Sequence, residues 1–142
     1  MSKILLSFTL VFVTSVVFGQ VNQKELAQKA TQELVTEYQL TTAQSTDMQK
    51  IQERKYRNLA EITDLKKSDL VLYIRKMESL EYGTDMSIMR LFKNNKAQLA
   101  TFNKIRGERR LEKAKFQQEM KNEGLSAEEI ETKYWEAQFA KF

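Results

Sequence analysis

The chain of 142 residues contains no cysteine, no histidine and no proline, and it has only four glycines. Without cysteine, it can form neither disulfides nor thiolate metal sites, and it has no cysteine nucleophile. Without histidine, it lacks the commonest metal ligand, the usual general base near neutral pH and every serine–histidine pair. Few glycines and no proline argue against a β-sandwich or barrel, which needs a turn about every ten residues. These absences predict a non-catalytic protein without a cofactor.

The remaining composition favours helices, because glutamine, lysine, glutamate, alanine, leucine and arginine are all good helix formers. Apolar residues recur at helical spacing along most of the chain. The run 70–74 also fits a buried strand, but both of its flanks have a helical pattern. The sequence therefore predicts an all-α protein of four to five amphipathic helices. The expected helices lie at about residues 21–38, 42–67, 70–82 and 86–106, and from 126 to near the end.

Glycines mark the expected interruptions between these helices. Gly83 precedes Thr84 and Asp85, a combination typical of one helix ending and the next being capped. Past Gly107 the apolar stripe loses its helical phase, so we expect a kink, a break or a departure from the core there. Gly124 lies where a further helix would end.

Residues 1–19 have the pattern of a secretory signal peptide. Lys3 supplies a positive charge, residues 4–18 are mostly apolar, and the small Gly19 lies just before Gln20. The apolar stretch is shorter than the roughly twenty residues that a membrane span needs, and no cysteine follows it to carry a lipid. We expect cleavage between Gly19 and Gln20, release into the periplasm, no stable membrane insertion and a single helical domain over 20–142.

Two segments carry the pattern of a capping box. In the first, Thr41 would cap the amide of Gln44, whose side chain would reach back to Thr41. In the second, Ser126 and Glu129 would act in the same way. Both segments are therefore expected to start a helix, and together they suggest a weak internal repeat. The motif residues are Leu40, Thr41, Gln44, Leu125, Ser126 and Glu129.

A signal peptide, a basic helical chain of this size and an exact Leu-Thr-x-x-Gln at 40–44 together resemble the Spy/CpxP family of periplasmic proteins. The segment 48–62 continues in the style of that family, whose members usually carry two such motifs. The second motif departs from the pattern, since residues 125–129 have serine for threonine and glutamate for glutamine. The resemblance implies an elongated, bent helical hairpin that dimerises into a cradle. The concave face of such a cradle binds unfolded or partly folded proteins without ATP.

A basic segment is the candidate client-binding surface. Six basic residues lie between 104 and 115 against two acidic ones, and a phenylalanine lies on either side. Basic side chains attract other chains at long range, and apolar side chains hold them. The alternative is an ordinary solvated helix face. Export makes a nucleic acid a remote partner. The candidate residues are Phe102, Lys104, Arg106, Arg109, Arg110, Lys113 and Phe116.

The last predicted helix has two apolar sides. Trp135, Phe139 and Phe142 follow each other at helical spacing on a different side from Ile130 and Tyr134. A helix with two apolar sides needs two partners, so one side is expected to contact a dimer mate or a client. A chain of this size with a thin core and no disulfide also favours a homodimer.

Metal binding and catalysis have little support in the sequence. Met77, Met86, Met89 and Met120 are able to act as soft ligands for Cu(I), but methionine at helical spacing more often fills a core. Chemistry that uses carboxylates alone stays open, although no nucleophile–base pair can be assembled without cysteine or histidine.

The sequence leaves two hypotheses about function. The first is an exported, ATP-independent chaperone-like protein that binds unfolded clients in the cell envelope and suppresses their aggregation. The second is a non-catalytic envelope-stress adaptor or sensor module that binds one specific protein partner. A chaperone should accept many unfolded clients, whereas an adaptor should ignore them.

Overall fold

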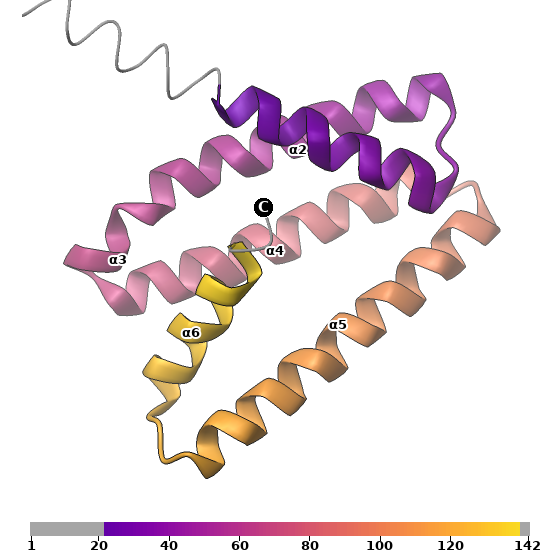
Figure 1. The fold of residues 1–142 in the computed structure, drawn as a ribbon. Helices are drawn as coiled ribbons and strands as arrows, with labels where there is room; N and C mark the ends of the chain where they lie inside the picture. Colours follow the sequence, from indigo (N-terminus) through magenta and orange to yellow (C-terminus); the bar gives the residue numbers. More distant parts are fainter. Residues whose placement is uncertain (1–21, 140–142) are drawn as a thin grey trace, which may run out of the picture.

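The computed structural model describes residues 22–139, which consist of α-helices and short connections without a strand (Figure 1). The predicted all-α class is therefore confirmed, and the run 70–74 is helical. The expected cleavage site, Gly19 and Gln20, lies outside the described residues. A first helix covers residues 22–38. It is followed by α2 (Thr42–Thr63), α3 (Leu65–Ser68), α4 (Leu70–Phe92), α5 (Lys96–Asn122) and α6 (Ala127–Phe139).

The helices are arranged around α4, which contacts α2, α3, α5 and α6 (Figure 1). The helix over 22–38 and α2 run antiparallel, and the short α3 turns the chain so that α4 runs back along α2. From the far end of α4, α5 returns in the opposite direction and diverges from it. The last helix, α6, folds back across the space between α5 and the middle of α4. Along residues 22–139, no helix has both the length and the hydrophobicity that a membrane span needs.

The expected break at Gly83 is wrong, because α4 runs without interruption from Leu70 to Phe92. Thr84 does not start a new helix; its hydroxyl donates to the Leu80 carbonyl oxygen, one turn earlier in α4, at 2.8 Å. Asp85 does not cap a helix, since its carboxylate is bound by side chains of α5. The chain turns instead beyond Phe92, and Asn95 caps α5.

At Gly107 the structure shows neither a break nor an end, because α5 is continuous from Lys96 to Asn122. α5 does leave the core around Phe92 and Phe102 there, although Phe116 farther along packs against the core around Tyr134. The buried residues of α5, Gln98 and Phe102, both precede Gly107. α5 ends at Asn122, just before Gly124, which has a positive φ of 85° and donates its N–H to the Lys121 carbonyl oxygen at 3.0 Å.

The core of the described residues is divided into three clusters. One joins the helix over 22–38 to α2, α4 and α5, and another joins α6 to α2 and α4. A small third cluster fixes the helix over 22–38 on α2. The buried members of the first two clusters are Tyr38, Met48, Ile88, Phe92 and Phe102, and Ile62, Tyr73, Met77, Tyr134 and Trp135.

Candidate functional site

Both predicted capping boxes are present. The Thr41 hydroxyl accepts from the Gln44 N–H at 3.2 Å, and the Gln44 side chain accepts from the Thr41 N–H at 3.1 Å. The Ser126 hydroxyl accepts from the Glu129 N–H at 3.3 Å, and Glu129 accepts from the Ser126 N–H at 2.8 Å. Hydrogen bonding to the Glu129 carboxylate from the backbone N–H and the side chain of Ser126 lowers the pKa of that carboxyl. The two motifs therefore fix the starts of α2 and α6.

The glutamine of the first motif also connects α2 to α5. Its side-chain amide donates to the Gln98 side chain at 2.7 Å. Gln98 is buried and donates in turn to the Tyr38 carbonyl oxygen at 3.0 Å, at the end of the first helix. The ends of three helices thus meet at one glutamine pair. Sequence reasoning missed Gln98, although Asn95-x-x-Gln98 is itself a recognisable helix start, with Asn95 accepting from the Gln98 N–H.

Replacement of this buried glutamine should destabilise the protein. In Gln98→Ala the carbonyl oxygen of Tyr38 loses its side-chain donor, so the free energy of unfolding should fall by about 2 kcal/mol. Urea denaturation followed by circular dichroism measures this change. Gln118→Ala is the matched control, because Gln118 lies on the exposed side of the same helix and its side chain donates to Asn122. Equal stability of the two variants would contradict a junction role for Gln98.

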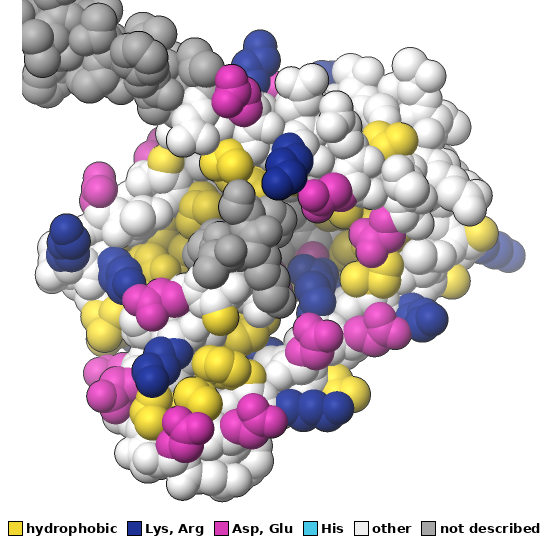
Figure 2. All heavy atoms as spheres, in the orientation of Figure 1, with side chains coloured by type: hydrophobic (Ala, Val, Ile, Leu, Met, Phe, Trp, Pro, Cys, Tyr) yellow, Lys and Arg dark blue, Asp and Glu magenta, His cyan; other side chains and the backbone are white. Residues whose placement is uncertain are grey.

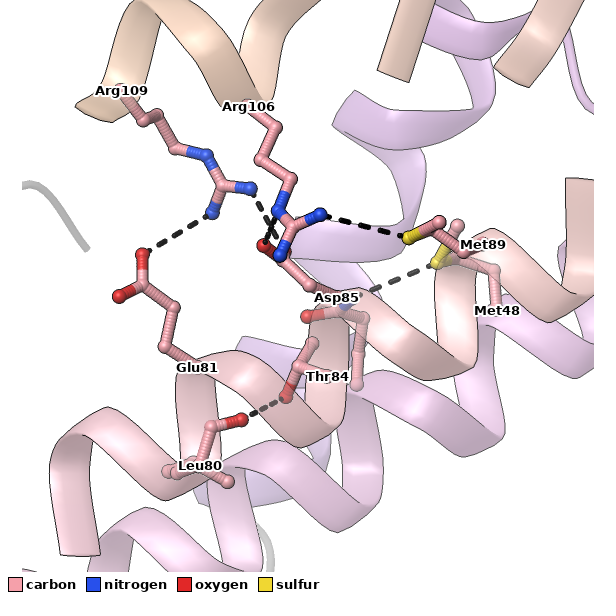
Figure 3. A network of polar contacts seen from close by, with 9 residues as sticks. Met48, Leu80, Glu81, Thr84, Asp85, Met89, Arg106 and Arg109 are labelled. Carbon is pink, nitrogen blue, oxygen red and sulfur yellow. Dashed lines mark hydrogen bonds and ion pairs between the residues drawn. The ribbon is translucent and has the colours of Figure 1, made fainter. Parts of the chain in front are cut away.

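Two arginines that α5 presents toward α4 converge on one carboxylate (Figure 3). Arg106 Nε lies 3.0 Å from Asp85 Oδ2, and Arg109 Nη2 lies 2.8 Å from Asp85 Oδ1. Arg109 also approaches Glu81 at 3.6 Å, and Arg106 donates to the Met89 sulfur at 3.7 Å. The Asp85 side chain is only 8% exposed. The cluster therefore joins the two diverging helices through charge rather than through apolar packing.

The Arg109 guanidinium is held in its charged form. Burial alone would lower its pKa, but the hydrogen bond from Arg109 to Asp85 and the nearby carboxylates raise that pKa above its ordinary value. Lys55 of α2 responds in the opposite direction, since burial and the neighbouring Arg109 lower its pKa. Arg109 and Lys55 therefore place two cationic groups beside Glu81 and Asp85, where α2, α4 and α5 approach one another.

Farther along α5, Lys113 and Phe116 contact α6. Lys113 lies 2.9 Å from a carboxylate oxygen of Glu131, and its ammonium group lies over the rings of Tyr134 and Trp135, at 4.8 and 5.1 Å from their centroids. Phe116 packs against Tyr134 with 5.9 Å between ring centroids. Burial raises the pKa of Tyr134 to about 12. These side chains face the interior of the fold.

A groove of about 240 Å³ lies between α4, α5 and α6, and we call it the α4–α5 groove. Tyr82 forms its exposed apolar edge, with 61% of its surface accessible. Figure 2 shows basic, acidic and hydrophobic side chains side by side on the face that carries α5 and α6. The basic and aromatic lining consists of Tyr82, Arg106, Arg109, Arg110, Lys113 and Tyr134, and the acidic lining of Glu78, Glu81 and Asp85.

The structure does not bring the predicted basic segment together as one exposed surface. Phe102 is 1% exposed and belongs to the core, so its predicted contact with a client is wrong for this fold. Lys104 is exposed and lies 3.9 Å from Glu108 on its own helix. Arg110 is exposed and lines the groove. The remaining members, Arg106, Arg109, Lys113 and Phe116, point inward as described above.

The predicted second apolar side of α6 is also corrected. Trp135 is only 4% exposed and packs in the same cluster as Tyr134, so the chain itself covers it. Its predicted contact with a dimer mate or client is therefore wrong in this arrangement. The side chain of Phe139 and the whole of Phe142 lie outside what the structure describes. The homodimer stays a prediction.

Of the methionines considered as metal ligands, Met77 is 1% exposed in the core and Met89 accepts a hydrogen bond from Arg106. Among the described residues, acidic side chains form no group of three or more suited to a metal ion.

No family model, no curated protein and no solved structure matches this chain. The resemblance to the Spy/CpxP family therefore stays a prediction that rests on the residues of the motif and on the helical pattern.

Proposed function

We propose that this chain is an exported, ATP-independent chaperone-like protein that binds unfolded or partly folded proteins in the periplasm and suppresses their aggregation. The α4–α5 groove is the observation that carries the proposal. It combines an exposed aromatic ring, Tyr82, with the exposed charge of Arg110 in one hollow. A positive charge accelerates the encounter with a client, and an aromatic ring holds apolar segments of many sequences.

A non-catalytic role fits the groove chemistry. Asp85 and Glu81 both line the groove, and both are bound by Arg109. Their pairing with Arg109 is a structural contact between α4 and α5. With no histidine or cysteine in the sequence, we assign these carboxylates to holding α5 in place.

The test is aggregation suppression by the exported protein. An unrelated, chemically denatured protein is diluted into a slight molar excess of the chain without ATP, and light scattering is followed at low and high salt. We expect suppression that weakens with salt, because salt screens the capture step. Mass spectrometry of the same sample checks cleavage between Gly19 and Gln20.

Variants locate the activity in the groove. Tyr82→Ser combined with Arg110→Glu should raise the amount of chain needed for suppression by about fivefold, since both the apolar contact and the steering charge are lost. Lys115→Glu is the matched control, because Lys115 is exposed on the same helix but does not line the groove. Absence of suppression at either salt concentration would overturn the proposal and favour an adaptor for one specific partner.

A further inference from the structure

The last helix occupies a surface that has the chemistry of a helix-binding site. Ile130, Tyr134 and Trp135 of α6 are all buried. The surface that covers the two aromatic side chains is apolar at its centre, formed by Ile62 of α2, Tyr73 and Met77 of α4 and Phe116 of α5. We call these four residues, together with Lys66 and Lys113, the α6-binding surface.

Charged pairs at both ends of α6 set its register. Near the start of α6, Glu131 binds Lys113 and accepts a hydrogen bond from Gln117, both of α5. Near its end, Glu136 binds Lys66 of α3. A carboxylate on either side of an aromatic pair is therefore the feature that this surface recognises.

The fit of α6 on this surface is incomplete. Trp135 Nε1 is buried and finds no hydrogen-bond acceptor among the described residues. A buried donor without an acceptor gives up its hydrogen bond to water and gains none in return, so it destabilises the docked helix. Trp135 also borders a cavity of about 150 Å³ that Met77 and Leu80 line, and Tyr134 borders the α4–α5 groove on the other flank. Unfilled space on both flanks forfeits packing contacts, so α6 is held less tightly than its burial suggests.

A short turn joins α6 to α5. The turn contains Gly124 at φ 85° and is closed by a hydrogen bond from the Leu125 N–H to the Met120 carbonyl oxygen at 3.2 Å. Because α6 has only 13 residues, it depends on its docking surface for most of its stability.

We infer that α6 is a displaceable internal ligand, and that the α6-binding surface receives an amphipathic helix from a client in its place. The client helix carries two adjacent aromatic residues with one carboxylate about one turn before them and another after them, as Glu131 and Glu136 stand on either side of the aromatic pair in α6. Lys113 selects for this pattern, since it binds the carboxylate and lies over both rings. This inference rests on the proposed function, because it names the client segment that the chaperone recognises.

A cross-link between α6 and α3 tests whether α6 must move. The chain has no cysteine, so Lys66→Cys with Glu136→Cys allows specific joining of two contacting surface positions by a bismaleimide. The same variant capped with a monofunctional maleimide is the matched control. The probe is a fluorescent peptide of residues 126–139, followed by anisotropy. The capped protein should bind it about tenfold more tightly than the cross-linked protein, in which the internal helix cannot leave.

Two further measurements separate displacement from general damage. Trp135→Ala weakens the internal helix but leaves the α6-binding surface intact, so it should increase the affinity for the peptide, whereas a merely structural role predicts a decrease. A peptide with Tyr134→Ser and Trp135→Ser should bind about tenfold more weakly. Equal binding by cross-linked and capped protein would overturn the inference. A stable dimer that exchanges α6 between copies would also overturn it, since a second copy would then be the partner.

Aggregation suppression by the same two samples distinguishes the inference from the proposed function. If the cross-linked protein suppresses aggregation as well as the capped one, the inference that a client displaces α6 is wrong, and the chaperone role stands. If the capped protein binds the peptide but does not suppress aggregation, the helix-binding surface stands and the general chaperone role is wrong.

Discussion

Phe102→Ala is expected to lower the free energy of unfolding by about 4 kcal/mol, because a fully buried ring is replaced by a cavity. The Phe102 side chain is 1% exposed, and its ring centroid lies 6.3 Å from those of both Tyr38 and Phe92. The three rings come from the first helix, α4 and α5, so the cavity opens where these helices meet. Urea denaturation followed by circular dichroism measures the loss.

Leu111→Ala is the control for this substitution. Leu111 lies on the same helix but is 57% exposed, so its truncation should change the free energy of unfolding by about 0.5 kcal/mol or less. A Phe102→Ala variant with unchanged stability and weaker client binding would contradict the core assignment and restore the predicted client contact.

The features that the sequence predicts well are local ones. Helical periodicity and the capping boxes depend on residues three or four positions apart, and both capping boxes have the predicted hydrogen bonds. The predicted client contact of Phe102 is wrong, because the residue is buried. The basic residues that follow it in the sequence do not indicate which side of the helix the rest of the fold covers.

The features that the sequence does not predict depend on partners far along the chain. Asp85 resembles a helix start until Arg106 and Arg109 of the next helix are seen to bind it. The loss of phase after Gly107 has a similar cause. Before that point α5 packs into the first cluster, and beyond it Lys113 and Phe116 face α6 instead. In the sequence, a continuous helix that changes its packing partner therefore shows the same loss of phase as a helix that breaks.

Asp85→Ala is the second substitution with a large expected effect, a loss of about 3 kcal/mol in the free energy of unfolding. The variant leaves the guanidinium groups of Arg106 and Arg109 without their shared carboxylate. The arginine side chains are 20% and 38% exposed, so water compensates for part of the loss but not for all of it. Because apolar contacts between α4 and α5 lie mainly near Phe102, removal of Asp85 should also loosen the half of α5 that carries the α4–α5 groove.

Asp47→Ala is the control for Asp85, because Asp47 pairs with Lys50 at 3.0 Å while its side chain is 57% exposed. That substitution should cost about 0.5 kcal/mol or less, and added salt should remove most of the difference. The loss at Asp85 should persist in high salt, since screening acts mainly on exposed charges. Urea denaturation of both variants at two salt concentrations makes the comparison. Equal small losses in the free energy of unfolding at Asp85 and Asp47 would show that apolar contacts hold α5. The charge cluster would then be a surface feature rather than the connection between α4 and α5.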